Sequence, residues 1–399
     1  MEDSMLRHNE ASPLFRWRFS YWSRVMPSIV VMILLPPLVA SAQTFTTLYS
    51  FTGGADGKNP EAPLIIDSKG NLFGTTEDGG KGCVIGCGVV FRVDPSGRET
   101  VAYSFSGGSD GGHPEAGLIG DAHGNVYGTT VNGGDPACDC GTVFMLDREG
   151  NETVLHAFIG GNDGAVPLAG LIRDSMGNLY GTTFYGGPSN NGTVFRVNPS
   201  GKETVLYAFK DFEDGWNPFA GVIAVGNALF GTTYGGGIHG GGTVFKLAAN
   251  GKTILHNFDG INNDGTSPKG LLVYKGALYG TTTSGGGFTC NCGTIYRLDT
   301  SGETILHSFT GPDGTNPEAG LVRDEAGNCY GTTLEGGTGF GTIFELDTEG
   351  NETVLYSFTG GADGALPRAG LIIDKAGNLY GTTSIFGSHN GGTVFKLTR

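Results

Sequence analysis

The chain has 399 residues, of which 73 are glycine and only 16 % are charged, and its formal net charge is −15. An acidic balance of this size repels nucleic acid and anionic lipid, so neither is an expected partner. The glycines recur at fixed places in a long repeat, which excludes a disordered low-complexity chain.

The first 42 residues differ in composition from everything that follows. Four arginines precede an apolar run at about residues 29–39, and the small residues Ala40-Ser41-Ala42 come next. This order is typical of a secretory signal peptide, and the run is shorter than the roughly 20 residues that a membrane span needs. We expect cleavage before Gln43, with an uncleaved N-terminal anchor as the alternative. The mature chain, without the four arginines and three acidic residues of this segment, has a net charge of −16 and would be secreted, extracellular or periplasmic, with no stable membrane span.

From about residue 44 to residue 397 the chain repeats one unit seven times. Each unit contains an aromatic-Gly-Thr-Thr motif, whose glycines are Gly74, Gly128, Gly181, Gly231, Gly280, Gly331 and Gly381. Two other motifs, Asp-Gly-x-x-Pro and a Gly-Thr or Gly-Val step followed by an apolar-aromatic pair, also occur seven times. A period near 50 residues is the signature of a propeller or a solenoid.

Each unit has four runs with strand character, which in the sixth unit are residues 319–324, 328–333, 341–347 and 352–358. The runs are rich in β-branched and aromatic residues and are separated by short Gly, Asn and Asp connections of the kind that form hairpins. The sequence therefore predicts an all-β fold, a seven-bladed β-propeller of four-stranded antiparallel blades.

The two ends of the repeat region complement each other. Residues 44–51 match only the fourth strand of a unit, whereas the last unit ends after its third strand. We expect the N-terminal strand to complete the last blade, which makes residues 43–399 one closed domain. Closure would bury two sheet edges, whereas an open solenoid would need polar capping repeats.

The pattern G-L-I-x-D-x-x-G-N-L-Y-G-T-T, followed by G-T-V-F-x-L-D and E-T-V-L-Y-S-F, resembles the GloVer-type tandem repeat of exported bacterial proteins. More distantly it is similar to the NHL-repeat propellers. The resemblance covers the whole mature chain and implies an extracellular or envelope repeat protein. It implies no particular biochemical role.

The aspartate of the Asp-Gly-x-x-Pro motif is a candidate calcium ligand, because calcium prefers oxygen donors. The seven residues are Asp56, Asp110, Asp163, Asp214, Asp264, Asp313 and Asp363. The alternative is that each aspartate accepts hydrogen bonds within its own turn. Since a specialised site usually breaks symmetry and these seven do not, the turn interpretation is favoured.

Six of the seven cysteines lie in loops between second and third strands, namely Cys83, Cys87, Cys138, Cys140, Cys290 and Cys292. Export favours disulfides, and we expect pairing within each loop, with pairing between the first two units or metal binding as alternatives. Cys329 replaces the usual leucine of a second strand, so we expect a buried free thiol.

Three glutamates follow the motif proline and would lie near the mouth of the central channel: Glu61, Glu115 and Glu318. Lactonase-type propellers hold a metal in this channel, so these residues are candidate metal ligands for an alternative function, a metal-dependent hydrolase or lactonase. His113, His239 and His389 lie on rim loops of different units and form no repeated catalytic pattern. We therefore expect no catalytic residues and no enzyme activity.

Aromatic residues on the glycine-rich rim loops could stack on sugar rings or contact a protein, and the alternative is that they cover their own loops. The candidates are Tyr185, Trp216, Phe219, Tyr234, Phe288 and Phe340. The sequence thus predicts a monomeric binding or scaffold module for an extracellular glycan or protein, with no cofactor apart from calcium in the first interpretation of the turns.

Overall fold

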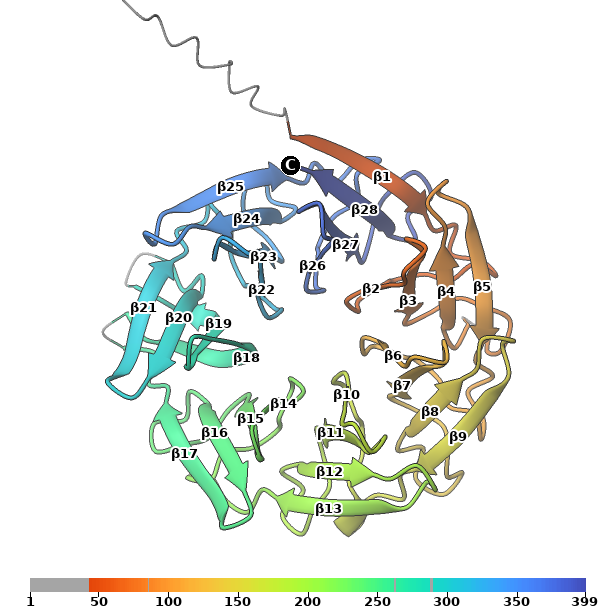
Figure 1. Ribbon diagram of the computed structural model, residues 1–399, viewed down its shortest axis with the longest axis horizontal. Coiled ribbons are helices and arrows are strands. Elements are labelled where there is room, and N and C mark those ends of the chain that lie inside the picture. The colour runs from red at the N-terminus through yellow and green to blue at the C-terminus, as the bar shows by residue number, and fades with distance from the viewer. Residues whose placement is uncertain (1–42, 85, 262, 288–289) are drawn as a thin grey trace, which may run out of the picture. The chain divides into compact units, whose positions relative to one another are not determined.

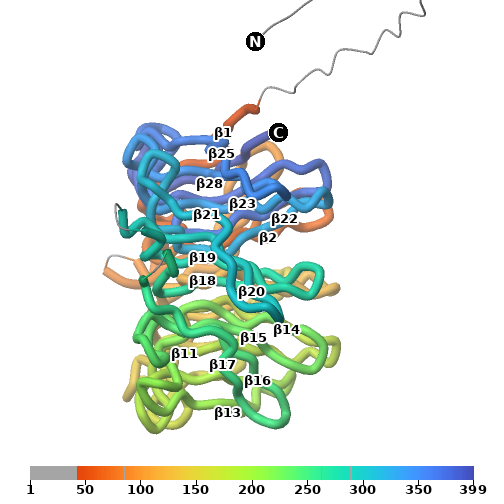
Figure 2. The backbone as a smooth tube through the Cα atoms, turned by 90° about the vertical axis from the view of Figure 1, so that its left-hand side faces the viewer, coloured from red at the N-terminus to blue at the C-terminus, as the bar shows by residue number. Residues whose placement is uncertain are grey.

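The computed structural model describes residues 43–84, 86–261, 263–287 and 290–399, so the predicted signal peptide and Phe288 lie outside the described residues. Seven four-stranded antiparallel sheets surround a central axis, which confirms the predicted seven-bladed β-propeller (Figure 1). Seen edge-on, the ring carries loops on both faces (Figure 2). Among the described residues, no helix is long and apolar enough to cross a membrane.

The two inner strands of each blade contain the aromatic-Gly-Thr-Thr motif and the segment before it. The innermost strands are β2 (Ile65–Ile66), β6 (Ile119–Gly120), β10 (Ile172–Arg173), β14 (Ile223–Val225), β18 (Gly265–Tyr274), β22 (Val322–Arg323) and β26 (Ile372–Ile373). The second strands are β3 (Leu72–Thr76), β7 (Val126–Thr130), β11 (Leu179–Thr183), β15 (Ala228–Thr233), β19 (Ala277–Gly285), β23 (Cys329–Thr333) and β27 (Leu379–Thr383).

The two outer strands complete each blade. The third strands are β4 (Val89–Val93), β8 (Thr142–Leu146), β12 (Thr193–Val197), β16 (Thr243–Ala248), β20 (Thr294–Asp299), β24 (Thr342–Leu346) and β28 (Thr393–Thr398). The fourth strands are β5 (Glu99–Ser104), β9 (Glu152–Ala157), β13 (Glu203–Ala208), β17 (Gly251–Asn257), β21 (Gly302–Ser308), β25 (Glu352–Ser357) and β1 (Thr44–Ser50). A short 3-10 helix, η1 (Gly161–Asp163), follows β9.

The innermost strands are shorter than predicted in most blades. In blade six the expected strand 319–324 is reduced to β22, Val322–Arg323. The preceding Ala-Gly segments crowd together at the axis, where a Cβ on Gly221 would lie 2.5 Å from the carbonyl oxygen of Gly170. These segments therefore pass beside each other, and sheet pairing begins only further along the chain.

The ring is closed as predicted. Strand β1 pairs antiparallel with β28, and the last blade has the order β1-β28-β27-β26. In Figure 1, β1 lies along the outside of β28. Phe45 of β1 stacks on Tyr356 of blade six with ring centroids 4.0 Å apart. The first strand therefore packs a partly buried aromatic side chain against the neighbouring blade.

The Gly-Thr-Thr motif fits blade against blade. A Cβ on Gly74 would lie 2.6 Å from the ring of Phe91, so only glycine lets the third-strand aromatic lie across the second strand. The first threonine donates to a backbone carbonyl of the next blade, as Thr75 does to Ala116 at 3.1 Å. The phenylalanine after each fourth strand packs edge-on against a third-strand ring of the next blade, as Phe51 does on Phe91. These contacts recur round the ring, which explains why the motif is repeated so closely.

Candidate functional site

The aspartates of the Asp-Gly-x-x-Pro motif hold their own turns. Asp56 accepts hydrogen bonds from the Tyr49 hydroxyl at 2.8 Å and from the backbone N–H of Thr52 at 2.7 Å. His156 and His307 take the place of the tyrosine in other blades and lie 3.1 Å and 3.0 Å from the corresponding aspartates. These hydrogen bonds are the ones that the turn interpretation predicts.

The cysteines are paired within their loops. The sulfur atoms of Cys83 and Cys87 are in bonding contact, as are those of the pairs 138/140 and 290/292, with Cα–Cα distances of 5.3, 5.1 and 5.1 Å. This is the arrangement of local disulfides rather than of cross-blade pairs. Cys329 is buried and free.

Seven side chains, one from each blade, line a cavity of about 390 Å³ in the central channel. Each is the residue directly after the motif proline. The seven residues, in blade order, are Glu61, Glu115, Leu168, Phe219, Lys269, Glu318 and Arg368. Sequence reasoning selected only the three glutamates of this set. We call these seven residues the channel ring.

A second set of variable residues lies beside the channel ring. Each follows the Gly-Thr-Thr motif, and the loop that begins there pairs with the Asp-Gly-x-x-Pro segment of its own blade, as the bridge between Lys58 and Asp78 shows. The set comprises Glu77, Val131, Phe184, Tyr234, Thr283, Leu334 and Ser384. Phe184 contacts Phe219 of the next blade, at 6.2 Å between ring centroids. The two sets break the seven-fold symmetry of the propeller around the channel ring.

One side of the channel ring is charged. Arg368 lies between two of the predicted glutamates, with its Nε 3.2 Å from Glu61 and its terminal nitrogen 2.9 Å from Glu318. Burial raises the pKa of Glu61 to about 7 and, followed by the charge of Glu77, raises the pKa of Glu115 to about 7. The structure thus brings Glu61 and Glu318 together around the guanidinium group of Arg368. This group supplies the positive charge that a metal ion would supply in the predicted site.

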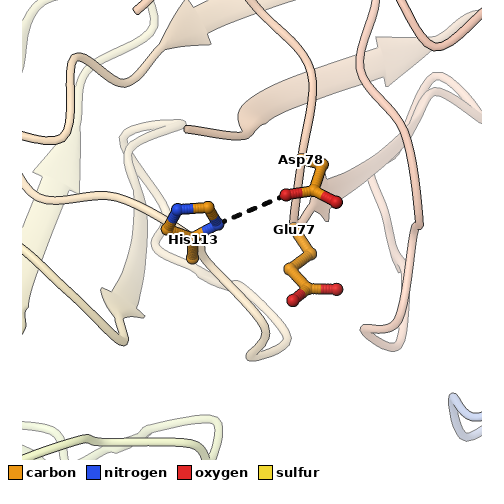
Figure 3. A group of neighbouring side chains, drawn as sticks. All are labelled: Glu77, Asp78 and His113. Carbon is orange, nitrogen blue, oxygen red and sulfur yellow. Dashed lines mark ion pairs between the residues drawn. The ribbon is translucent and has the colours of Figure 1, made fainter. Parts of the chain in front are cut away.

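Among the described residues, three groups of side chains could hold a metal ion. Two contain motif aspartates, His256 with Asp264 and Glu303, and His307 with Asp313 and Glu352. The third, near the channel ring, consists of Glu77, Asp78 and His113 and is shown in Figure 3. Their ligand atoms lie within 4.8 Å of one another, and Nδ1 of His113 is 3.5 Å from a carboxylate oxygen of Asp78. Asn59 donates to the other oxygen of Asp78 at 3.1 Å. Burial, followed by the neighbouring charge of Asp78, raises the pKa of Glu77. Sequence reasoning named His113 without these partners, because the carboxylates come from the adjacent blade.

The other side of the channel ring is aromatic. Four of the predicted ligand-binding residues lie in adjacent blades here: Tyr185, Trp216, Phe219 and Tyr234. Tyr185 packs on Phe184, which in turn contacts Phe219, and Trp216 lies 6.2 Å from Tyr234. Tyr185 and Tyr234 remain 43 % and 39 % exposed. This aromatic cluster consists of Phe184 and the four predicted residues.

Phe340, another predicted ligand-binding residue, does not belong to the aromatic cluster. Phe340 packs on Phe386, with ring centroids 5.8 Å apart, in the loops of blades six and seven. Phe288 lies outside the described residues. The aromatic cluster also meets a residue that sequence reasoning missed, Lys269, whose Nζ lies 3.6 Å from the ring centroid of Phe219. The signal was present in the sequence, because Lys269 occupies the same repeat position as the three selected glutamates.

Solved structures with a similar fold include the extracellular domain of a one-component system from B. thetaiotaomicron, with a TM-score of 0.58 and 10 % identity. The match covers 88 % of this chain but only 39 % of that one. A gluconolactonase from Xanthomonas campestris matches with a TM-score of 0.45 and 14 % identity over 90 % of each chain. The first similarity supports the propeller fold alone, and the second is too low to carry an argument. No curated protein matches the chain.

A family model described as the Gloeobacter/Verrucomicrobia repeat matches residues 37–175, 137–337 and 274–399. These overlapping matches cover all seven blades, in agreement with the repeat pattern and the closed ring. The chain belongs to the family of Gloeobacter/Verrucomicrobia repeat proteins.

Proposed function

We propose that this protein is a secreted or cell-envelope binding module that contacts an extracellular glycan or protein through the face around the channel ring. The proposed location follows from the signal-peptide pattern of the first 42 residues. The module acts as a monomer and catalyses no reaction. Its acidic surface repels nucleic acid.

The observation that carries this proposal is the local loss of symmetry. The contacts between blades repeat round the ring, whereas the channel ring contains five residue types in seven blades and the set beside it contains seven. Packing between equivalent blades favours the same or a similar residue at each equivalent position, whereas recognition of an asymmetric ligand does not. The variable positions are therefore the natural place for a binding site.

The chemistry of this face suits a glycan in particular. Exposed faces of Tyr185 and Tyr234 offer flat apolar surfaces for sugar rings. The carboxylates of Glu61, Glu115 and Glu318 on the far side of the channel ring offer acceptors for hydroxyl groups. A cavity of about 390 Å³ is within the range of small-ligand sites.

A glycan array followed by calorimetry of each hit tests the proposal. Tyr234→Ala should weaken binding about fivefold, because one stacking contact is worth about 1 kcal/mol. Phe340→Ala is the matched control, since Phe340 packs on Phe386 away from the aromatic cluster, and it should leave the affinity unchanged. Equal loss in both variants, or no glycan or protein ligand at all, would refute the proposal.

The group of Glu77, Asp78 and His113 favours a second candidate, a metal-dependent hydrolase or lactonase with its metal beside the channel. Metal analysis of the purified protein and thermal unfolding with and without a chelator separate the two candidates. A stoichiometric metal that is lost in His113→Ala would support the hydrolase. If the protein contains no metal and its melting temperature is the same with and without the chelator, the hydrolase candidate is eliminated.

A further inference from the structure

Lys269 is buried at the channel ring without an anionic partner. The residue is only 3 % exposed, and its ammonium group lies over Phe219 at 3.6 Å and near Tyr234 at 5.7 Å. In the part of the chain that the structure describes, this group makes these ring contacts but no hydrogen bond or ion pair. A charged amine removed from water in this way is costly unless an opposite charge compensates it.

A second buried lysine shows how the same fold satisfies an ammonium group. Lys252 has a side chain that is also 3 % exposed, yet its Nζ lies 2.8 Å from a carboxylate oxygen of Asp214. It also lies near aromatic rings, 5.0 Å from that of Phe209. The two lysines therefore share burial and aromatic neighbours, and they differ in the anion.

The carboxylate of Glu318 is near enough to influence Lys269 through its charge, but it is already paired with Arg368. This carboxylate accepts from Arg368 at 2.9 Å, and Arg368 also pairs with Glu61. Lys269 lines the same cavity as these residues, so a ligand in the cavity has access to the ammonium group. Burial lowers the pKa of Lys269 to about 8, which still leaves most of the amine protonated at neutral pH.

We propose that Lys269 binds the carboxylate of an acidic sugar whose ring lies against Tyr234, so that the glycan of the proposed function is one that contains uronic acid. This inference rests on the proposed function. The carboxylate supplies the missing anion, and the sugar ring covers the exposed face of the tyrosine beside it.

The test uses a panel of uronate oligosaccharides, such as trigalacturonate, each paired with its methyl ester, and measures binding by calorimetry at pH 6.5. The ester keeps the shape of the sugar and removes the charge. The protein should bind at least one acid about tenfold or more tightly than its ester. Lys269→Met should remove that preference, whereas Lys269→Arg should retain part of it, and the exposed Lys275→Met of the same blade should keep all of it.

Three results would overturn the inference. Equal affinity for acid and ester, or an acid preference that survives in Lys269→Met, would refute the role of the lysine while glycan binding stands. If the protein bound only neutral glycans, with an affinity that Tyr234→Ala lowers, the role of Lys269 would likewise be refuted while glycan binding stands. If nothing binds either in this panel or in the glycan array of the proposed function, glycan recognition itself is removed, so the two failures are distinguishable. Lys269→Met should unfold at the same temperature as the unaltered protein or higher, which shows that a lost preference is not misfolding.

Discussion

Replacing Glu99 and Glu152 by glutamine should stabilise the propeller in alkaline solution. Each glutamate begins a fourth strand and is partly buried facing the turn aspartate of its own blade, Asp56 or Asp110. Burial, followed by the charge of that aspartate, raises the pKa of both glutamates to about 7. The native protein therefore holds a proton at each of these sites that the unfolded chain gives up at lower pH.

The direction and size of the effect follow from this difference. A raised carboxyl pKa contributes stability that is complete below the ordinary value of 4.5 and is lost as the pH rises through about 7. At about 1.4 kcal/mol per pKa unit, the upper limit is about 3.5 kcal/mol for each glutamate, and solvent screening of these partly buried groups reduces it to about 1 to 2 kcal/mol. Sites in separate blades add, so the double variant should gain about 2 to 4 kcal/mol at pH 8, or about 3 to 5 °C in melting temperature.

Thermal unfolding followed by circular dichroism at pH 4.5 and at pH 8 measures the effect. The double variant should melt higher than the unaltered protein at pH 8 and at nearly the same temperature at pH 4.5, because glutamine resembles the protonated acid. Glu349→Gln is the control, since that side chain is exposed in a hairpin. An unchanged melting temperature at pH 8, or an equal rise at both pH values, would refute the reasoning.

Three further changes test the contacts between blades by denaturant unfolding. Gly128→Ala should cost about 1 to 3 kcal/mol or more, because its Cβ would lie 2.7 Å from the ring of Phe144, and an unaltered midpoint would contradict this close approach. Thr182→Val should cost about 1 kcal/mol, since it removes the donor to the Ala220 carbonyl at 3.2 Å but keeps the volume; a neutral result would mean that the bond adds nothing. Phe45→Ala should cost about 3 kcal/mol by removing the ring stacked on blade six, and no loss would show that closure does not depend on it.

The fold could be predicted almost completely from the sequence because the pattern of each strand occurs seven times in the repeat. Period, strand count and the role of the N-terminal strand all follow from motif positions that any one unit would leave ambiguous. The exception is the length of the innermost strands. Ala319 and Gly320 resemble the start of a strand, but they run past the neighbouring blade at the axis before pairing begins, and crowding between blades is invisible within a single repeat.

The candidate site was only partly predictable, for a related reason. The three channel glutamates were found as acids after proline, yet the lysine, arginine and phenylalanine at the same repeat position belong to the same ring. Comparing all seven units at that position would have found them. The pairing of Glu77 and Asp78 with His113 could not be found in this way, because it joins different positions of two adjacent blades.

The pairing of β1 with β28 also imposes an order of events on synthesis. The first strand of the propeller leaves the ribosome before every other blade strand, but its partner is the last one made. Six blades can assemble from neighbouring segments while β1 has no partner. The seventh blade can be completed only after β28 has been made. A polypeptide interrupted between residues 358 and 393 would therefore carry six complete blades, while β1 and β27 would lack the strand that joins them and would be exposed to aggregation.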